Sequence, residues 1–406
     1  MKYHLVILTL FAVSFPGALY SADWNGFRGP LGNPVHDGTL PLNWNTQDKT
    51  NIAWEQKLPG RGVSGPIAVG DKIIVTASGG VNQQRLFVLC FDQKSGKPVW
   101  KRNFWATGRT YSHPTSANAA PTPVSDGTSV FAFFSSNDLI CLDLNGNLKW
   151  FRGLAHDYPK AGNDVGMAAS PVVAGNVVIV QIENQGDSFA CGIDKTTGVE
   201  IWRIPRDARA NWCSPTTYVH PDGSPIVVLQ SGSGLTALDA ETGKPAWKLG
   251  ISCGTIASPL VIQDKLYVAS QGTTKLDLAS NSTDPEVIWS ANKLGLNATS
   301  PLVHDGIFYG ISGSIIKGAN ASTGQVLWQL RLRGRFWASP IYSNQHLYCI
   351  NQDGQVHIIK LSGGPEEQTA ELVSEFEMGE PVLGTPAAAG NSLFIRSDKH
   401  LWRISN

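Results

Sequence analysis

Asp239-Ala-Glu-Thr-Gly-Lys-Pro-Ala-Trp247 places an acidic residue, a glycine and a tryptophan at short fixed intervals, with the tryptophan four residues beyond the glycine. The aspartate can accept backbone N–H groups in an Asx-type turn, and the glycine can adopt a positive φ. This chemistry predicts a β-hairpin whose second strand carries the tryptophan. The same spacing from glycine to tryptophan, with an acidic or amide residue three or four residues before the glycine, recurs at Asp92/Gly96/Trp100, Asp143/Gly146/Trp150, Asp194/Gly198/Trp202 and Asn320/Gly324/Trp328.

A second repeated element is a small or hydroxyl residue followed by proline and then an apolar run. It occurs at Gly65-Pro66, Thr122-Pro123, Ser170-Pro171, Ser214-Pro215, Ser258-Pro259, Ser300-Pro301, Ser339-Pro340 and Thr385-Pro386, spaced by 39 to 57 residues. Proline at the start of a strand costs no ladder hydrogen bond. A four-stranded unit of about 45 residues cannot bury both faces alone, so such units stack radially. The repeat predicts an all-β, eight-bladed β-propeller with four-stranded antiparallel blades and tryptophans between adjacent blades.

The two ends of the repeat region complement each other. The last unit stops one strand short, while residues 51–58, which include Trp54, form an orphan fourth strand before the first unit. We expect this N-terminal strand to close the ring beside the strand around Leu401 to Ile404, which leaves no open sheet edge. The fifth unit lacks the turn glycine before Trp289, and the seventh carries an acidic stretch at 363–371. Both are predicted to be blades, with Phe376 substituting for the tryptophan of the seventh.

The first residues are typical of an export signal. A positively charged start, a nine-residue apolar run at 5–13 and the small residues Ser21 and Ala22 predict a signal peptide over 1–22. The apolar run is too short to span a bilayer, which takes about 20 residues. We therefore expect an N-terminal extension over 23–50 and a single propeller domain over 51–406, in a periplasmic or secreted protein without a transmembrane segment. No cysteine stands near the cut to carry a lipid anchor.

Charge and cysteine usage narrow the function classes. Lys plus Arg equals Asp plus Glu, at 32 each, so no global positive field favours nucleic acid. The six cysteines contain no C-x-x-C pair, so metal and redox motifs are absent from the sequence. Cys90 and Cys141 each lie two residues before a repeat aspartate and are expected to be buried free thiols. Cys213 and Cys253 lie near connections on one expected face, and their state is left open.

The repeat resembles that of the pyrroloquinoline-quinone-like (PQQ-like) propellers, which include quinoprotein alcohol dehydrogenases and the BamB-type subunit of the outer-membrane β-barrel assembly machinery. The resemblance covers about residues 51 to 406. The leader from Asp23-Trp24 through Phe27-Arg28-Gly29-Pro30 to Trp44 is similar to that of secreted planctomycete-type propellers. The resemblance implies fold and compartment more firmly than function.

Several catalytic motifs are excluded by context. Residues 60–65 fit G-x-G-x-x-G, but they lead into a strand at Pro66 instead of a helix. Quinoprotein dehydrogenases need a catalytic aspartate, Ca²⁺ with oxygen ligands and a stacking platform for the quinone. The family resemblance also implies a pair of adjacent cysteines above that ring, and no two cysteines are adjacent here.

Two long connections between blades are the candidate ligand site. They span residues 103–120 and 153–168, flank the same blade and are expected to be neighbours on one face, and function is commonly carried by loops on a rigid scaffold. The candidate contacts are Trp105, Arg109, Tyr111, His113, Asn118, His156, Asp157, Tyr158 and, from a later connection, Trp337. Solvated loop residues and packing between blades are the alternative interpretations. No catalytic or metal-ligating residue is assigned.

The leading hypothesis is a monomeric, non-catalytic binding or scaffold propeller that needs no cofactor and has a protein or extracellular polymer as partner. The alternative is a quinoprotein-like alcohol or sugar dehydrogenase that uses PQQ and calcium. Hydrolysis of a sugar has less support, because no carboxylate pair can be singled out.

Overall fold

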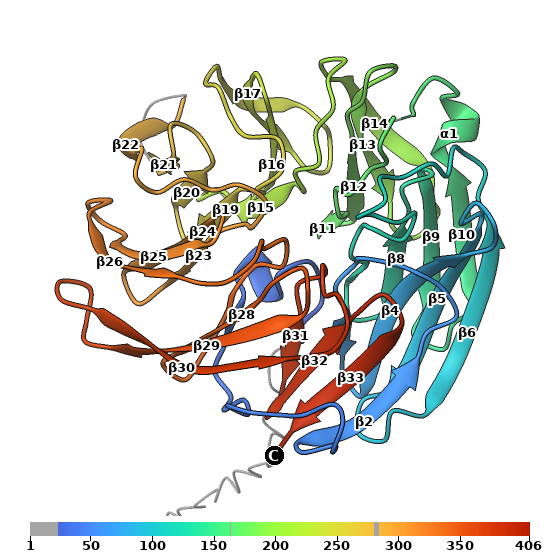
Figure 1. Cartoon of the computed structure of the whole chain (residues 1–406). Coiled ribbons are helices and arrows are strands. Elements are labelled where there is room, and N and C mark those ends of the chain that lie inside the picture. Colours follow the sequence, from blue (N-terminus) through green and yellow to red (C-terminus); the bar gives the residue numbers. More distant parts are fainter. Residues whose placement is uncertain (1–22, 163, 280–283) are drawn as a thin grey trace, which may run out of the picture.

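The protein is an all-β ring (Figure 1). The structure is a computed structural model that describes residues 23–162, 164–279 and 284–406. Within these ranges the strands form eight sheets, each built on four consecutive antiparallel strands or, in the last, on both ends of the chain. The predicted eight-bladed β-propeller is confirmed. The predicted signal peptide lies outside the described residues.

Seven blades are continuous in sequence, and each runs from the centre of the ring to its edge. Blades 1 to 4 consist of β3 (Ile67–Val69), β4 (Lys72–Gly79), β5 (Arg85–Asp92) and β6 (Pro98–Trp105); β7 (Val124–Ser125), β8 (Ser129–Phe133), β9 (Asp138–Asp143) and β10 (Leu148–Gly153); β11 (Val172–Ala174), β12 (Val177–Ile182), β13 (Phe189–Asp194) and β14 (Glu200–Pro205); and β15 (Thr216–Val219), β16 (Pro225–Ser231), β17 (Gly234–Asp239) and β18 (Pro245–Leu249). Blades 5 to 7 consist of β19 (Leu260–Ile262), β20 (Lys265–Val268), β21 (Thr273–Asp277) and β22 (Glu286–Ala291); β23 (Leu302–His304), β24 (Ile307–Ser312), β25 (Ile315–Asn320) and β26 (Val326–Arg331); and β27 (Ile341–Ser343), β28 (His346–Ile350), β29 (Gln355–Ser362) and β30 (Thr369–Glu377).

Blade 8 closes the ring with strands from both termini. It consists of β31 (Ala387–Ala389), β32 (Ser392–Arg396), β33 (His400–Ser405) and, as its outer strand, β2 (Ile52–Lys57). β2 and β33 are antiparallel, with Ile52 opposite Ile404 and Gln56 opposite Leu401. This pairing confirms the predicted closure and removes the free edge that an open ring would expose.

Five of the eight junctions between blades share one contact. The tryptophan of each outer strand lies on the turn glycine of the next blade, and its indole N–H donates to a backbone carbonyl beside that turn, as Trp150 does to Lys195 at 3.0 Å. A Cβ added at Gly198 would lie 2.7 Å from the Trp150 ring, and Gly198 has φ +75°. The glycine therefore serves both the turn and the indole of the preceding blade. The pairs are Trp54/Gly96, Trp100/Gly146, Trp150/Gly198, Trp202/Gly243 and Trp289/Gly324.

The junction between blades 7 and 8 is built differently, and it corrects one prediction. In the other outer strands the tryptophan follows a register shift, and in blade 7 the residue after that shift is Ser374, opposite Ile358. Phe376 is two pairs further along, opposite Val356, so it does not take the tryptophan position. It contacts Trp44 of the N-terminal extension instead, with ring centroids 4.6 Å apart. The bulge that sets this register is not visible in the sequence.

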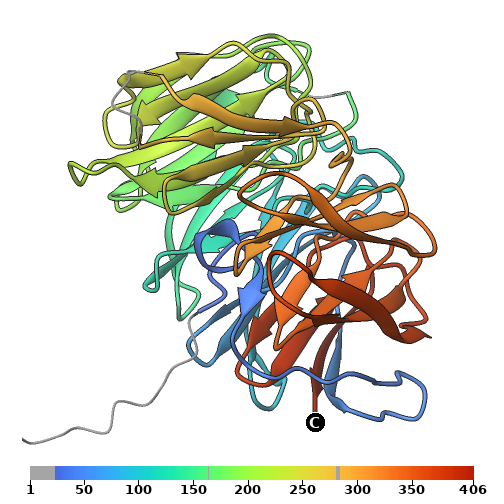
Figure 2. The ribbon, with the colours of Figure 1, turned by 90° about the vertical axis from the view of Figure 1, so that its left-hand side faces the viewer.

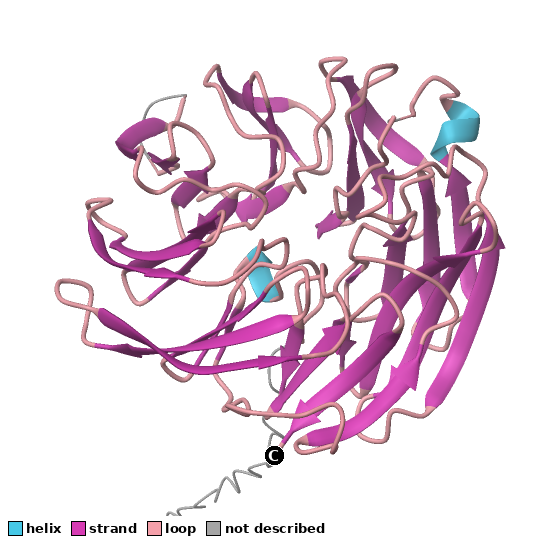
Figure 3. Ribbon diagram, in the orientation of Figure 1, coloured by secondary structure: helices cyan, strands magenta, loops and turns pink. Residues whose placement is uncertain are grey.

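The N-terminal extension is part of the fold (Figure 2). β1 (Val35–His36) pairs in parallel with β27, and buried Trp44 donates to the Met378 sulfur at 2.9 Å. Before them, the 3-10 turn η1 (Pro30–Gly32) lies at the centre of the ring (Figure 3). The extension therefore runs from the channel to the rim beside the C-terminal blades.

The remaining predictions on the fold concern thiols and membrane spans. All six cysteines are buried and unpaired, which confirms the prediction for Cys90 and Cys141. The one α-helix of the described chain, α1 (Leu154–Asp157), is a single turn, so no helix in this part is long and apolar enough to cross a membrane.

Candidate functional site

Serine and threonine hydroxyls form a ring around the central channel. In seven of the eight blades the residue before the first-strand proline donates its backbone N–H to the hydroxyl of the equivalent residue in the next blade, as Ser170 does to Ser214 at 2.9 Å. Seven such bonds of 2.9 to 3.1 Å link Gly65, Thr122, Ser170, Ser214, Ser258, Ser300, Ser339 and Thr385 in order. The eighth junction has no hydroxyl, because a Cβ at Gly65 would lie 2.5 Å from the Thr385 carbonyl oxygen. The residues that precede the first-strand prolines therefore form a hydrogen-bonded belt, which sets the channel's width.

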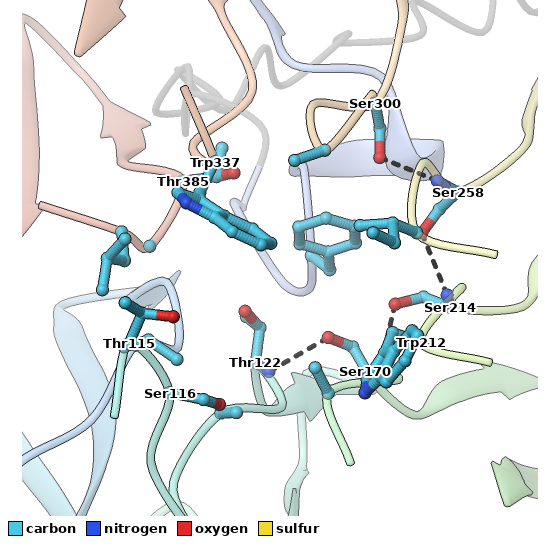
Figure 4. A pocket seen from close by; sticks show the side chains of 18 of the residues that line it. Thr115, Ser116, Thr122, Ser170, Trp212, Ser214, Ser258, Ser300, Trp337 and Thr385 are labelled. Atoms are coloured by element: carbon cyan, nitrogen blue, oxygen red, sulfur yellow. Dashed lines mark hydrogen bonds between the residues drawn. The ribbon is translucent and has the colours of Figure 1, made fainter. Parts of the chain in front are cut away.

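The channel holds a cavity of about 340 Å³ beside this belt (Figure 4). Its walls are mainly apolar, with Val63, Val165, Ile256 and Leu383 among them. Six of the belt hydroxyls line it, and Trp212 and Trp337 stand over it. This is the size range of small-ligand pockets, which begins at about 300 Å³.

Phe27 of the N-terminal extension separates this cavity from a second one of about 250 Å³, because its side chain belongs to the lining of both. Behind it, the guanidinium of Arg28 lies 5.2 Å from the Phe27 ring centroid and donates to the carbonyls of Pro259 and Pro301 at 2.7 and 3.3 Å. Burial lowers the pKa of Arg28 to about 9, so the group stays charged at neutral pH. The larger cavity is thus a blind pocket whose mouth faces the connections between blades.

The two long connections meet on this face, as expected from their positions on either side of blade 2. Arg109 and Asp164 form an ion pair at 2.9 Å, and the backbone N–H of His113 donates to the backbone carbonyl of Val165 at 2.9 Å. Buried Asp138 fixes the start of the first connection by accepting the N–H and hydroxyl of Thr107. Its desolvation raises the pKa of that carboxyl. The ion pair is exposed, so the backbone contact and the buried anchor contribute more to the loop geometry.

Two of the nine predicted contact residues, His113 and Trp337, line the cavity. His113 lies within hydrogen-bond distance of Thr115, with Nδ1 and Oγ1 2.8 Å apart. Trp337 is 40% exposed, and its indole N–H donates to Gln352 at 3.2 Å. Arg109 and Tyr111 stay outside the lining, where the guanidinium lies over the exposed phenol ring at 5.5 Å.

The other residues of the first connection have different places. Trp105, which was expected to line the opening, ends outer strand β6 and is 58% exposed beneath the Arg85 guanidinium. Asn118 is fully buried, and its amide group bonds to the backbone of Gln83 and Ser136. Asn118 thereby joins two blades and is not available to a ligand in the cavity.

The predicted residues of the second connection are also outside the cavity lining, and their contact with a ligand stays a prediction. His156 and Asp157 lie in α1, where Asp157 pairs with Arg152 of β10 at 2.6 Å. Tyr158 packs on Phe189 and bonds through its hydroxyl to Glu200 of outer strand β14. The single turn of α1 carries these side chains toward the rim, whereas only the later part of the connection returns to the channel.

Sequence reasoning missed three parts of the pocket. Trp212 was not among the predicted contact residues, yet it lines the cavity and donates to the Gly166 carbonyl at 2.8 Å. Phe27 lies in the non-repetitive extension, so no periodic signal marked it. The belt hydroxyls were used only as part of the repeat that marks the first strand of each blade. Their identity as Ser or Thr at seven of eight equivalent positions was the available signal.

The pocket does not fit the cofactor that the fold suggests. PQQ is a flat quinone with several carboxylates, and burying anions requires cationic or metal partners. The lining contains no Lys, Arg, Asp or Glu, and no group of three or more His, Cys, Asp or Glu in the described chain could hold a metal ion. Among the described residues of the lining, His113 is the only one with a titratable side chain, apart from hydroxyls. The geometry offers contact surface and hydrogen bonds, without an acid–base pair.

A family model described as outer membrane protein assembly factor BamB matches residues 42–191 and 87–317. A BamB from Legionella pneumophila is 25% identical over 201 residues, which are 45% of this chain and 50% of that protein. The chain thus spans half the length of this relative. A BamB from Moranella endobia is 25% identical over 306 residues, covering 73% of this chain and 71% of the relative.

Solved structures share the fold. The BamB of Moraxella catarrhalis superposes with a TM-score of 0.63 at 19% identity, over 87% of this chain and 97% of that one. A europium-containing methanol dehydrogenase gives a TM-score of 0.68 at 12% identity, over 92% of this chain and 89% of that one. Because an assembly factor and a dehydrogenase both have this architecture, the fold alone does not select a function.

Proposed function

Because this chain belongs to the family of outer membrane protein assembly factor BamB, we propose that it is a non-catalytic, protein-binding scaffold of the cell envelope. The partner is either an outer membrane protein or a component of the machinery that assembles outer membrane proteins. The predicted signal peptide over 1–22 supports a periplasmic location. The protein binds its partner on the face that carries the cavity mouth.

One observation of the site carries this proposal. The mouth combines exposed tryptophan and loop surface with a lining that has no pair of groups for proton transfer. General acid–base catalysis needs such a positioned pair, whereas protein contacts are dominated by buried aromatic anchors. Trp337, partly exposed and held by Gln352, has the character of an anchor that is ready before binding. The misfit of PQQ to the lining speaks against the dehydrogenase alternative.

Site-specific photocrosslinking tests the proposal. A photoreactive amino acid at Trp337 probes the mouth, and the same amino acid at Val219 is the matched control. Val219 is 71% exposed at the end of β15, and the first strand of a blade starts at the belt and ends on the opposite face. In cells of the host we expect crosslinks from position 337 to an outer membrane protein or to a component of its assembly machinery, identified by mass spectrometry. Equal crosslinking from position 219, or none from 337, would contradict the proposed face.

A further inference from the structure

The belt hydroxyls have hydrogen-bonding capacity left over. Each accepts a backbone N–H from the preceding blade, and in the described part of the chain none of the seven donates its own proton to a protein acceptor. Six of them line the cavity. A hydroxyl can donate one hydrogen bond while it accepts another. The belt therefore presents a set of O–H donors to whatever enters the pocket.

The rest of the lining selects against charge. Apart from His113 at the mouth, it consists of apolar, hydroxyl and indole side chains and a glycine. The buried cation Arg28 lies behind the Phe27 ring and already bonds to two carbonyls. Moving an ion from water into such surroundings costs several kcal/mol, because no partner compensates the lost hydration. An uncharged group loses much less.

The three aromatic rings of the lining favour a ring-shaped occupant. Trp212, Trp337 and Phe27 come from two connections and the N-terminal extension, and they line one cavity of about 340 Å³. Aromatic pairs attract each other in edge-to-face and offset geometries, beyond the effect of buried area. A single ring with a short substituent fits this volume, and an oxygen acceptor on it can meet the belt hydroxyls.

We propose that the central pocket binds an uncharged aromatic group that carries an oxygen acceptor. The inference rests on the proposed function in one respect, since the pocket opens on the face assigned to the partner. Two sources present this chemistry. One is an aromatic side chain of that partner together with its own backbone carbonyl, and the other is a free aromatic carbonyl compound.

Three probes of nearly equal shape test the charge selectivity. Benzamide is neutral, benzoate is an anion and benzamidine is a cation, and calorimetry measures their binding to the full chain at neutral pH. We expect benzamide to bind at millimolar concentration and both ions to bind at least about tenfold more weakly. PQQ, as a larger anionic ring, should not bind. Equal or tighter binding of either ion, or no binding of benzamide, would overturn the proposal.

Variants test whether the probe occupies this pocket. Ala298→Trp fills the cavity, and Ala208→Trp places the same side chain on an exposed connection outside the lining. We expect the first to abolish benzamide binding and the second to leave it unchanged, with circular dichroism confirming that both fold. Trp337→Leu, at a partly exposed site, replaces the first variant if it misfolds, and should weaken binding about tenfold or more. Benzamide binding that survives Ala298→Trp, or Trp337→Leu where that variant replaces it, would overturn the assignment.

A capped Gly-Phe-Gly tripeptide separates the two sources of the ring. Tighter binding of the tripeptide than of benzamide assigns the pocket to a partner's side chain, whereas weaker binding assigns it to a free compound. The crosslinking at position 337 remains an independent readout. Its success with no charge selectivity would remove this inference and leave the scaffold function standing.

Discussion

The junctions between blades fall into two kinds, and the difference shows what the repeat signature does. At a regular junction such as that of blades 3 and 4, buried Trp202 lies on Gly243 and donates to the Ala240 carbonyl at 2.8 Å. At the next junction blade 5 has no turn glycine, and Trp247 is less buried and donates to Tyr218 of its own blade. At the junction of blades 6 and 7 a side-chain acceptor, Gln368, replaces the turn carbonyl for Trp328. The glycine and the tryptophan of one repeat thus serve two different junctions.

The junction of blades 7 and 8 follows from the same logic. Blade 8 has no turn between its third and outer strands, because β33 and β2 come from the two ends of the chain. An indole in blade 7 would have no turn glycine to contact, and Ser374 stands in that register position. Trp44 of the extension supplies the aromatic packing there. At this junction both repeat residues are absent, and the N-terminal extension supplies the aromatic contact.

Tryptophan truncation is expected to give the largest difference between the two kinds of junction. Trp202→Ala removes a buried indole and its hydrogen bond, and should lower the free energy of unfolding by about 3–5 kcal/mol. Trp247→Ala removes a partly exposed indole and should cost clearly less. Chemical denaturation measures both. Equal losses would show that the turn glycine adds nothing to the regular junction.

Turn glycines offer a more specific comparison. Gly198 and Gly127 both have positive φ, at +75° and +85°, but a Cβ meets the Trp150 ring only at Gly198 and meets nothing within 4 Å at Gly127. Gly127→Ala should cost about 1–2 kcal/mol from backbone strain. Gly198→Ala should cost about 1–3 kcal/mol more, because the indole must shift. Similar losses in denaturant titrations would argue against close packing of the indole on the glycine.

The hydroxyl belt does not distinguish regular from irregular junctions, and a single substitution tests whether it is energetically uniform. Ser214→Ala leaves the buried Ser170 N–H without its acceptor, which should cost about 1–3 kcal/mol. Ser374→Ala, in outer strand β30, removes a hydroxyl outside the belt and should stay within about 0.5 kcal/mol. The Ser258→Ala variant removes the acceptor of the Ser214 N–H at the irregular junction of blades 4 and 5, and should match Ser214→Ala. A markedly smaller loss of unfolding free energy in this variant would mean that the belt is weaker where the tryptophan contact at the rim is irregular.

The sequence predicted what depends on neighbours along the chain. The turn at Asp239 and Gly243 and the proline before each first strand are local features, so the hairpins and the blade count could be inferred. The contact of Trp202 with Gly243 joins two repeats, and it forms only because neighbouring blades pack around the ring in this order and orientation. Register was less accessible, because the bulge that separates Ser374 from Phe376 leaves no mark in the residue pattern.

For the candidate site, the sequence predicted which connections meet, but it did not predict which of their side chains reach the pocket. The meeting of the two connections follows from their positions on either side of blade 2, and the Arg109–Asp164 pair shows it. The directions of their side chains depend on tertiary packing, which draws Tyr158 onto Phe189 at the rim. The ligand role of the nine candidate residues stays a prediction, with His113 and Trp337 now the two that reach the pocket.

The reactivity of buried thiols compares the two kinds of junction with the smallest perturbation of the protein, because the native thiols at the regular junctions are left unchanged. Cys90 and Cys141 pair across the strand with Trp100 and Trp150, and burial raises the pKa of each thiol to about 12. At pH 8 only about one thiol in ten thousand is then ionised in the closed state, so alkylation reports transient opening of the junction. Ala237 holds the same position opposite Trp247.

We therefore expect an introduced Ala237→Cys thiol to be alkylated faster at pH 8 than Cys90 or Cys141 in the same molecule, as measured by site-resolved mass spectrometry. The internal comparison cancels differences in reagent and pH. The sign of the pH effect also follows: a thiol whose pKa is raised by folding stabilises the folded state below its ordinary pKa of about 9, and that contribution is lost as pH rises toward about 12. Stability should thus fall above pH 9 in the wild type and fall less in Cys90→Ala. If the introduced thiol reacts no faster than the native ones, the irregular junction opens no more readily than the regular junctions, and the turn glycine determines packing geometry without determining local stability.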